Sequence, residues 1–330
     1  MKNQIIFRIR LSIFAGILLI IANGCDNEDA IELPKLTTTS LTEITQSSVK
    51  TGGEIISNGG TEIISQGICW GTVPNPTINA SLITDTTKTN SFTSLLSGLK
   101  DNTTYYLRAY ATNSSGTAYG NELSFTSLTF NTYIVTDIEG NTYNALTIGS
   151  QDWFTENLKT SHYSNGDLIP DGTEIGDISS ETNPKYCFTY DNNSDNITTY
   201  GKLYTWYTVT DSRNICPDGW HVPTDTEWIT LTKYLGGEST AGGKLKEIGT
   251  NHWKSPNEGA SNESGFSAIP GGYRYQDGTF QTKGYLAYWW SSTEDNEENA
   301  SFRRINYVSS NIYKLNYLKT HAFSVRCIKD

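Results

Sequence analysis

One stretch decides the fold of the second half of this chain: CPDGWHVPTDTEW, residues 216–228. Its last five residues predict a helix start, because Thr224 can cap the free backbone N–H groups and Glu227 can bond back to the Thr224 amide. From Trp228 onward apolar residues recur at helical spacing until a Gly-Gly pair ends the run. The stretch therefore predicts a capped helix over residues 225–235. The two prolines before it predict a stiff approach that presents aromatic residues to a core.

The composition narrows the class of protein. The chain has 330 residues, which is long enough for two domains, and a formal net charge of −11. That acidic balance makes nucleic acid and anionic membrane surfaces poor partners. Only 18% of the residues are charged, while 20 are tyrosine. Such a composition suits an extracytoplasmic, β-rich protein with a hydrogen-bonding aromatic surface.

The N-terminal 25 residues predict a signal peptide. Lys2, Arg8 and Arg10 precede an apolar run of about a dozen residues, shorter than the ~20 that a bilayer-spanning helix needs. The following ANGC resembles a bacterial lipoprotein cleavage site, with Cys25 as the lipidated residue. The resemblance implies a chain held at the cell outer membrane by its lipid anchor alone, facing outward because acidic residues follow Cys25. The alternatives are an uncleaved anchor or an ordinary signal peptide with a chance cysteine.

The next part of the chain predicts an all-β domain. Residues 26–35 are polar and unpatterned, as in a short tether, and residues 36–128 contain strand-like runs separated by Gly, Asn and Ser. The runs cover residues 37–45, 48–56, 63–70, 91–96, 104–113 and 123–127. Short strands at this spacing predict a β-sandwich.

One segment of this domain carries a sharper signature. Residues 99–113, LKDNTTYYLRAYATN, resemble the tyrosine corner and following strand of fibronectin type III domains. The resemblance makes Trp70 the core tryptophan and residues 116–120 the hairpin before the last strand. It implies little about function, because such domains are usually spacers.

Residues 131–330 predict a domain that mixes helices and strands. A hairpin over residues 135–148 opens it, and helical patterns follow at residues 200–210, 225–235 and 241–248. Strand-like runs then cover residues 266–269, 272–275, 288–292, 302–307 and 322–327. Two main helices held between strands from both ends of a domain indicate an α+β fold.

Six motifs of this domain occur in a recognisable order. They are WFTENL (153–158), YGKLYTW (200–206), the opening stretch (216–228), GFSA (265–268), WWSST (289–293) and FSVRC (323–327). Together they resemble the Fibrobacter succinogenes major paralogous domain. That family is similar to formylglycine-generating enzymes and C-type lectin-like domains, which implies a C-type lectin-like α+β fold. The resemblance also implies a disulfide between Cys216 and Cys327, which would persist in an exported protein.

The cysteines and histidines argue against catalysis. Formylglycine-generating enzymes bind copper through a cysteine pair before the last strand, and here no cysteine lies between Cys216 and Cys327. Cys69 and Cys187 are expected to be buried thiols, although the pairing of Cys187 stays open. The four histidines are scattered without metal-ligand spacing, and His221 suits a structural role. We therefore expect no catalytic residue, no cofactor and no metal centre.

Two acidic segments are candidates for calcium binding. Residues 191–195, DNNSD, place oxygen ligands at alternate positions, but the loop lacks the glycine and the final glutamate of a calcium-binding loop. Residues 294–299, EDNEEN, form a second acidic cluster. The lectin signatures EPN and WND are absent, so the calcium-dependent sugar site of lectins is not expected. A solvated turn explains each segment more simply.

Aromatic residues in the later loops are the remaining candidates for binding. Exposed Trp and Tyr beside polar residues are typical of glycan or protein recognition. Adjacent residues on a strand face opposite ways, so one of Trp289 and Trp290 should face outward. The candidates are Trp253, Tyr273, Arg274, Tyr275 and one of Trp289 or Trp290, with Glu294 and Asp295 at the rim. The alternative is that these aromatic residues pack over a loop-rich fold.

These observations favour a surface-exposed lipoprotein whose second domain is a non-catalytic binding or adhesion module. Its expected partner is an extracellular polysaccharide or a cell-surface protein. The competing hypotheses are a divergent enzyme on a formylglycine-generating-enzyme-like fold and a purely structural cell-surface component. The sequence does not specify the ligand or the oligomeric state.

Overall fold

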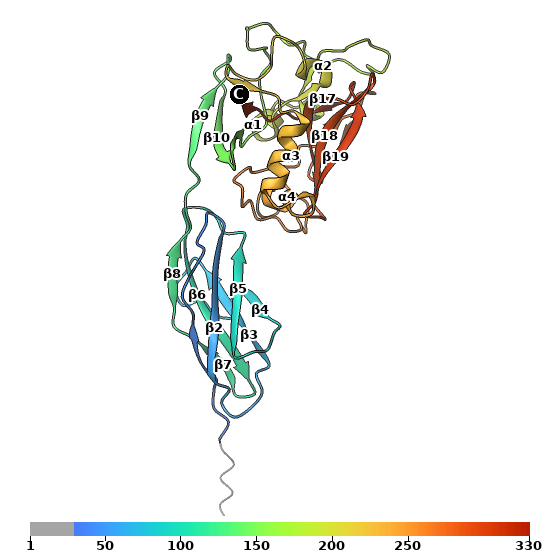
Figure 1. The fold of residues 1–330 in the computed structure, drawn as a ribbon. Helices are drawn as coiled ribbons and strands as arrows, with labels where there is room; N and C mark the ends of the chain where they lie inside the picture. The colour runs from blue at the N-terminus through green and yellow to red at the C-terminus, as the bar shows by residue number, and fades with distance from the viewer. Residues whose placement is uncertain (1–29) are drawn as a thin grey trace, which may run out of the picture.

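The computed structural model describes residues 30–330. The predicted signal peptide, the lipidation of Cys25 and the start of the tether lie outside the described residues. The chain forms two units arranged end to end and joined by one extended connection (Figure 1). Within residues 30–330 no helix is both long enough and apolar enough to cross a membrane.

The first unit is a sandwich of two sheets. One sheet has the order β1 (Lys35–Thr38), β2 (Ser48–Ser57), β5 (Ser91–Ser97). The other has the order β4 (Ser81–Asp85), β3 (Ser65–Gly71), β6 (Thr104–Asn113), β7 (Gly116–Tyr119), and β8 (Leu123–Thr126) also pairs with β6. Alternate residues of these strands, among them Val49, Ile68 and Leu107, are fully buried between the sheets. The predicted β-sandwich is therefore confirmed.

The tyrosine corner has the expected geometry. The Tyr105 hydroxyl accepts a hydrogen bond from the backbone N–H of Lys100 at 2.9 Å. Trp70 is only half-buried and packs edge-to-face on Tyr105, with ring centroids 5.7 Å apart. Cys69, on the opposite face of the same strand, is fully buried. The sequence did not predict β4, because its residues are mostly exposed and polar.

In the second unit, strands from the beginning and from the end of the sequence pair in one sheet. That sheet has the order β14 (Trp220–His221), β21 (Ile328–Lys329), β11 (Gln151–Phe154), β10 (Thr142–Ile148), β9 (Thr132–Thr136). The hairpin β9–β10 confirms the predicted opening of this unit. Trp153 near its start lies opposite Ile328 near the C-terminus, so the ends of the unit are held side by side.

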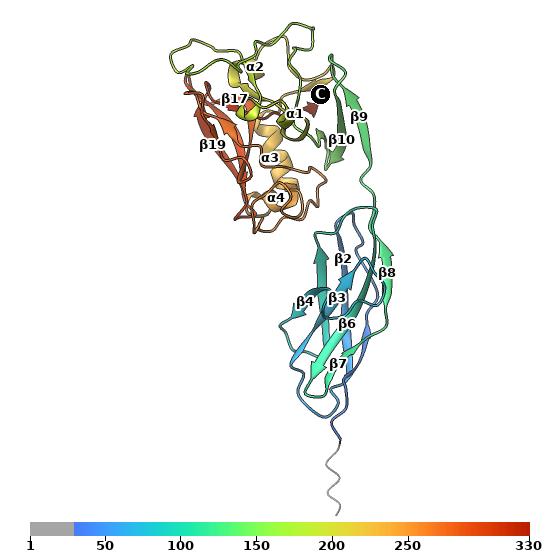
Figure 2. The ribbon, with the colours of Figure 1, turned by 180° about the vertical axis from the view of Figure 1, so that it is seen from behind.

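Two further sheets complete the unit. One is three-stranded, with the order β17 (Leu286–Glu294), β18 (Asn299–Asn306), β19 (Ile312–Leu318). The other has the order β12 (Cys187–Phe188), β13 (Leu203–Thr205), β20 (Ala322–Phe323), β15 (Tyr273–Arg274), β16 (Phe280–Gln281). The helices α3 (Asp225–Tyr234) and α4 (Glu238–Leu245) pack against the three-stranded sheet (Figures 1 and 2). An aromatic cluster that includes Trp153, Trp228 and Trp289 fills the core of this part.

The helix predicted from the opening stretch is present. The Thr224 hydroxyl accepts from the backbone N–H of Glu227 at 3.3 Å, and the Thr224 N–H donates to the Glu227 carboxylate at 2.7 Å. This is the predicted capping box at the start of α3. The next helix, α4, begins three residues before the predicted 241–248 and ends at Leu245.

Two secondary-structure predictions for the second unit were wrong, and several of its strands were missed. A single helix over residues 200–210 does not form, because Gly201 has φ +73° and residues 203–205 pair with β12 and β20 instead. The segment divides into α1 (Asp195–Tyr200), which follows the 3₁₀ turn η1 (Tyr190–Asn192), then β13 and α2 (Trp206–Val209). Residues 266–269 form only one isolated bridge, and β19 was not predicted.

Candidate ligand-binding groove

Trp253, expected at the surface, is buried. Only 1% of its surface is exposed, and its indole Nε1 donates to the backbone oxygen of Ala268 at 2.9 Å. The loop around it folds inward because the Asn257 side chain donates to the backbone oxygens of Glu247 and Gly249. The prediction that Trp253 presents a free ring to a ligand is therefore corrected.

Arg274 is also buried rather than exposed. Its guanidinium donates to the backbone oxygens of Ile175, Gly176 and Tyr275 and lies 4.1 Å from the ring centroid of Phe188. These contacts fasten the long loop before β12 to β15. Its donors are used inside the protein, so the predicted role of Arg274 in ligand binding is corrected.

Neither Trp289 nor Trp290 is exposed, although they point to opposite faces of β17 as expected. Trp289 packs against Trp228 on the helix side and donates through Nε1 to the Asn157 amide oxygen at 2.9 Å. Trp290 packs against Phe323, with ring centroids 4.2 Å apart, on the other side. The prediction that one of them faces solvent was wrong, because both faces of the sheet are covered at this point.

Tyr273 does line a groove, while its neighbour Tyr275 is half-buried beside it. The groove is an open cavity of about 300 Å³. Its lining residues are Tyr273, Tyr288, Phe302, Arg304, Leu315, Asn316, Tyr317 and Phe323. Apart from Tyr273, sequence reasoning missed these residues. The alternation of large residues along residues 302–304 and 313–317 is the signal that could have indicated a shared face.

Strand register builds the groove. In the three-stranded sheet Tyr288 lies opposite Arg304, and Phe302 lies opposite Leu315. Residues directly opposite on neighbouring strands share one face of the sheet, so these side chains form cross-strand rows. The helices pack on the other face, where Arg303 donates to the Asp225 carboxylate at 2.6 Å. The groove therefore lies on the sheet face that α3 leaves uncovered.

Packed aromatic rings fix the walls of the groove. Phe323 from β20 stacks on Tyr288, with ring centroids 5.1 Å apart, and packs against Phe302 at 4.8 Å. Tyr273 from β15 packs on Tyr288 at 4.9 Å. Each ring is held by at least one other, so little side-chain entropy remains to be lost when a ligand binds. Burial raises the pKa of Tyr273 to about 12, so its hydroxyl keeps its proton at neutral pH.

Arg304 is the charged residue of the groove. Its guanidinium carbon lies 5.0 Å from the ring centroid of Tyr313, which lies opposite it on β19. No carboxylate within residues 30–330 pairs with it, and its Nε is buried without a hydrogen-bond partner. The lining of the groove contains no Asp or Glu.

His321 lies fully buried beside the groove residue Tyr317. The two ring centroids are 4.3 Å apart, and Tyr275 packs on the imidazole at 4.4 Å. Neither ring nitrogen has a hydrogen-bond partner among the described residues. Burial lowers the pKa of His321 to about 4, so the ring is neutral at pH 7. It contributes an uncharged aromatic surface to the packing of the wall.

The two acidic segments are engaged with lysines. Glu294 pairs with the buried Lys319, whose ammonium also donates to the backbone oxygen of Glu297 at 2.8 Å. Asp191 lies 3.8 Å from the Lys283 ammonium. Within residues 30–330 no three His, Cys, Asp or Glu side chains come together in a set that could hold a metal ion.

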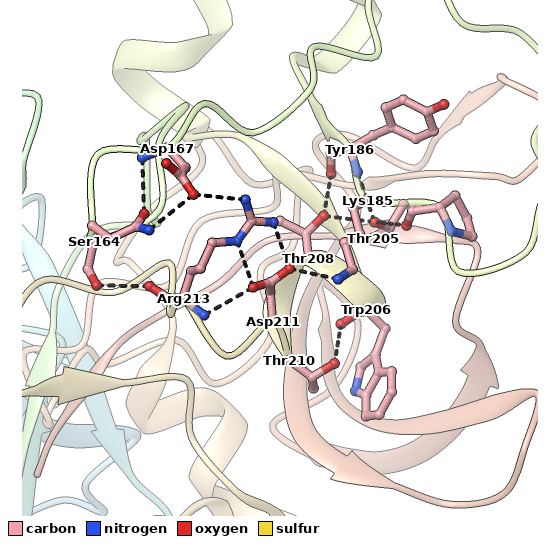
Figure 3. A network of polar contacts seen from close by, with 12 residues as sticks. Ser164, Asp167, Lys185, Tyr186, Thr205, Trp206, Thr208, Thr210, Asp211 and Arg213 are labelled. Carbon is pink, nitrogen blue, oxygen red and sulfur yellow. Dashed lines mark hydrogen bonds and ion pairs between the residues drawn. The ribbon is translucent and has the colours of Figure 1, made fainter.

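A second polar cluster lies on the loops around α2 (Figure 3). The Asp211 carboxylate accepts from Lys185 at 2.7 Å and from Arg213 at 2.8 Å. These hydrogen bonds, that of Arg213 first, hold the pKa of Asp211 well below its usual range. The Arg213 guanidinium lies 3.8 Å from the ring centroid of Tyr163 and also pairs with Asp167. Since each charge in the cluster is paired, the network fastens loops together.

The predicted disulfide is present. Cys216 and Cys327 are bonded across 111 positions of sequence. Cys69 and Cys187 are free and buried, as predicted. Burial raises the pKa of each thiol to about 11, so both remain protonated at neutral pH.

Comparison with known proteins gives one family and several solved structures. The family described as the Fibrobacter succinogenes major domain matches residues 146–329. The sensor domain of the anti-sigma factor RsgI4 from Pseudobacteroides cellulosolvens is 18% identical, with 30% of this chain and 98% of that chain covered and a TM-score of 0.23. The sixth fibronectin type III domain of human fibronectin type III domain containing protein 3 is 21% identical, with 30% and 83% covered and a TM-score of 0.21. A human fourth fibronectin type III domain is 19% identical, with 31% and 83% covered and a TM-score of 0.24. No curated protein matches the chain.

Proposed function

This chain belongs to the Fibrobacter succinogenes major domain family, and on that premise we propose that it is a non-catalytic binding protein of the bacterial surface. In this proposal the first unit is a fibronectin type III-like spacer. The second unit is a C-type lectin-like domain that holds an extracellular ligand, with a polysaccharide as the leading candidate and a cell-surface protein as the other.

The observation that carries the proposal is the groove on the three-stranded sheet. It is open, its walls are aromatic rings packed on one another, and Arg304 and Tyr317 add polar groups to its lining. Few polar groups set in a largely aromatic concavity are typical of ligand-binding sites. Aromatic faces of this kind stack on the apolar faces of sugar rings.

The disulfide and the predicted lipidation site both support a location outside the cytoplasm. The disulfide between Cys216 and Cys327 favours an oxidising compartment outside the cytoplasm. Lipidation of Cys25 would then anchor the chain at the outer membrane with both units facing outward. Metabolic labelling with a fatty-acid analogue should mark the wild type and not Cys25→Ala. Continued labelling of that variant would remove the anchor from the proposal.

A glycan array combined with a turnover screen of the full chain tests the binding function. We expect retention on a subset of glycans with no chemical change to them. Turnover of any compound would favour the divergent enzyme, and neither binding nor turnover would favour a structural component of the cell surface. If only proteins of the cell surface are retained, the ligand class of this proposal changes from glycan to protein.

Matched tyrosine variants connect the binding to the groove. Tyr317 is 37% exposed and lines the groove, whereas Tyr234 is 65% exposed on α3, away from the groove. Replacing Tyr317 by Ala should weaken glycan binding by about tenfold or more, since aromatic anchors of a site typically have effects of this size. Tyr234→Ala should bind as the wild type does. Equal binding by all three proteins would separate the function from the groove.

A further inference from the structure

Arg304 differs from every other arginine that the structure describes. Within residues 30–330 there are six arginines, and the other five donate hydrogen bonds to protein oxygens. Arg304 makes no such bond, and its Nε is buried without a partner. A half-buried guanidinium that faces no carboxylate leaves its positive charge uncompensated. An anion in the groove would compensate that charge.

Arg303, the neighbour of Arg304 on β18, is paired with a carboxylate on the other face of the sheet. Arg303 precedes Arg304 on β18 and points to the opposite face, where Asp225 accepts from it at 2.6 Å. On the groove face no lining residue is acidic, although the whole chain carries a formal net charge of −11. The fold thus provides a carboxylate where the sheet meets α3 and none where it opens to solvent.

The walls and the size of the groove favour a sugar ring. Tyr273 and Tyr317 offer ring faces and hydroxyl groups. A cavity of about 300 Å³ is at the small end of ligand sites, enough for one or two sugar residues. A protein partner would instead need a contact of ~800 Å² on each side.

We propose that the groove binds an acidic saccharide of the uronic acid class, with the sugar carboxylate on Arg304 and its ring against the tyrosines. The planar guanidinium matches a carboxylate by two parallel hydrogen bonds, which a point charge cannot do. This inference rests on the proposed binding function and specifies the ligand of the same site.

The probe is digalacturonate, with its dimethyl ester as the neutral control of the same ring structure. Calorimetric titration of the full chain should give an affinity for the acid at least about tenfold above that for the ester, and the difference should shrink as salt is raised. Arg304→Gln should abolish the difference while leaving the ester affinity within about twofold. Arg304→Lys keeps the charge without the fork and should retain part of the preference.

The possible outcomes distinguish a failure of the uronic acid assignment from a failure of the proposed binding function. Equal affinity of the wild type for acid and ester overturns the uronic acid assignment, whether or not any variant folds, and leaves the binding function standing. Binding of neither compound, together with an empty glycan array, removes the binding function itself. Tighter binding of a sulfated disaccharide than of digalacturonate overturns the carboxylate as the recognised group. Unchanged acid preference in a folded Arg304→Gln variant overturns the role of Arg304.

Discussion

Two tryptophans from distant positions share one core. Trp253 and Trp228 belong to the same buried cluster between the helices and the three-stranded sheet. Replacing either by Ala should therefore lower the free energy of unfolding by ~3–5 kcal/mol, through lost burial and the cavity that remains. Urea unfolding measures the loss, with Tyr234→Ala as a surface control that should stay near the wild type. Wild-type stability of Trp253→Ala would contradict its burial.

Because of His321, the free energy of unfolding should decrease as the pH is lowered. Burial lowers the pKa of His321 from 6.5 to about 4. Between pH 6.5 and pH 4, His321 is therefore protonated in the unfolded chain and neutral in the folded chain. The contribution of His321 is fully present above pH 6.5 and is lost as the pH falls to about 4, by roughly 3 kcal/mol in all. His321→Phe lacks this proton, so its stability should change less between pH 7 and pH 5. An identical change in both proteins would show that the imidazole is hydrated.

The residue scale is also where sequence reasoning reaches its limit. Arg303 and Arg304 are adjacent and have the same local surroundings in the chain, and only the register of β18 decides which one meets Asp225. Trp253 sits in a polar loop by sequence, and only the tertiary hydrogen bonds of that loop bury it. The candidate site was therefore predicted at Tyr273 and missed at its other positions.

At the scale of elements, helices and strands that are specified by neighbouring residues were predictable from the sequence. Elements that depend on pairing with another strand were not. The capping box at Thr224 needs four residues, all of them visible in the chain. The division of residues 200–210 at Gly201 depends on pairing with β12 and with β20, which is far away in sequence. The β-sandwich and the hairpin β9–β10 were predictable because hydrophobic alternation and turn residues are local. The short strands β12 and β16 exist only through their pairing.

The disulfide joins the segment before α3 to the residue that directly precedes the last strand, β21. In the chain-entropy model, closing a loop of 111 positions stabilises the fold by ~4–5 kcal/mol, so the Cys216→Ser/Cys327→Ser protein should unfold at correspondingly lower urea. Cys69→Ser, in the first unit, serves as the control for loss of a cysteine outside the bridge. Non-reducing peptide mapping should find the bridge and leave Cys69 and Cys187 free. A bridge from Cys187 to either partner would contradict this arrangement.

A neighbouring polar contact fastens the C-terminus to the same helix. His221 lies between two carboxylates, with Nδ1 2.6 Å from Asp330 and Nε2 2.9 Å from Glu227. Burial alone would lower its pKa, but the hydrogen bonds to Asp330 and Glu227 outweigh burial and raise it. This pair of ion contacts therefore stabilises the fold at low pH and fades as the pH rises through the raised pKa. Its pH dependence is opposite in sign to that of His321.

At the scale of the whole molecule, the two units meet through a short segment. Phe130 in that segment packs on the second unit, since a Cβ at Gly265 would lie 2.7 Å from its ring. The backbone N–H of Leu128 bonds to Thr45 at 3.0 Å on the side of the first unit. Residues 130–133 are too few and too apolar to act as a flexible linker, and these contacts hold the connection at both of its ends.

The edge strand β9 has a mechanical consequence. It continues the line of the first unit and pairs only with β10, in register from Thr132 opposite Leu146 to Thr136 opposite Thr142 (Figure 1). Tension between the first unit and a ligand in the groove would pull β9 lengthwise past β10, so all their backbone bonds would carry the load together. Single-molecule pulling should then show Val135→Pro yielding at lower force, because Val135 lies opposite Tyr143 in a hydrogen-bonded pair and proline removes its N–H. Beyond β9, the crosslink between Cys216 and Cys327 limits how far the second unit can extend under load.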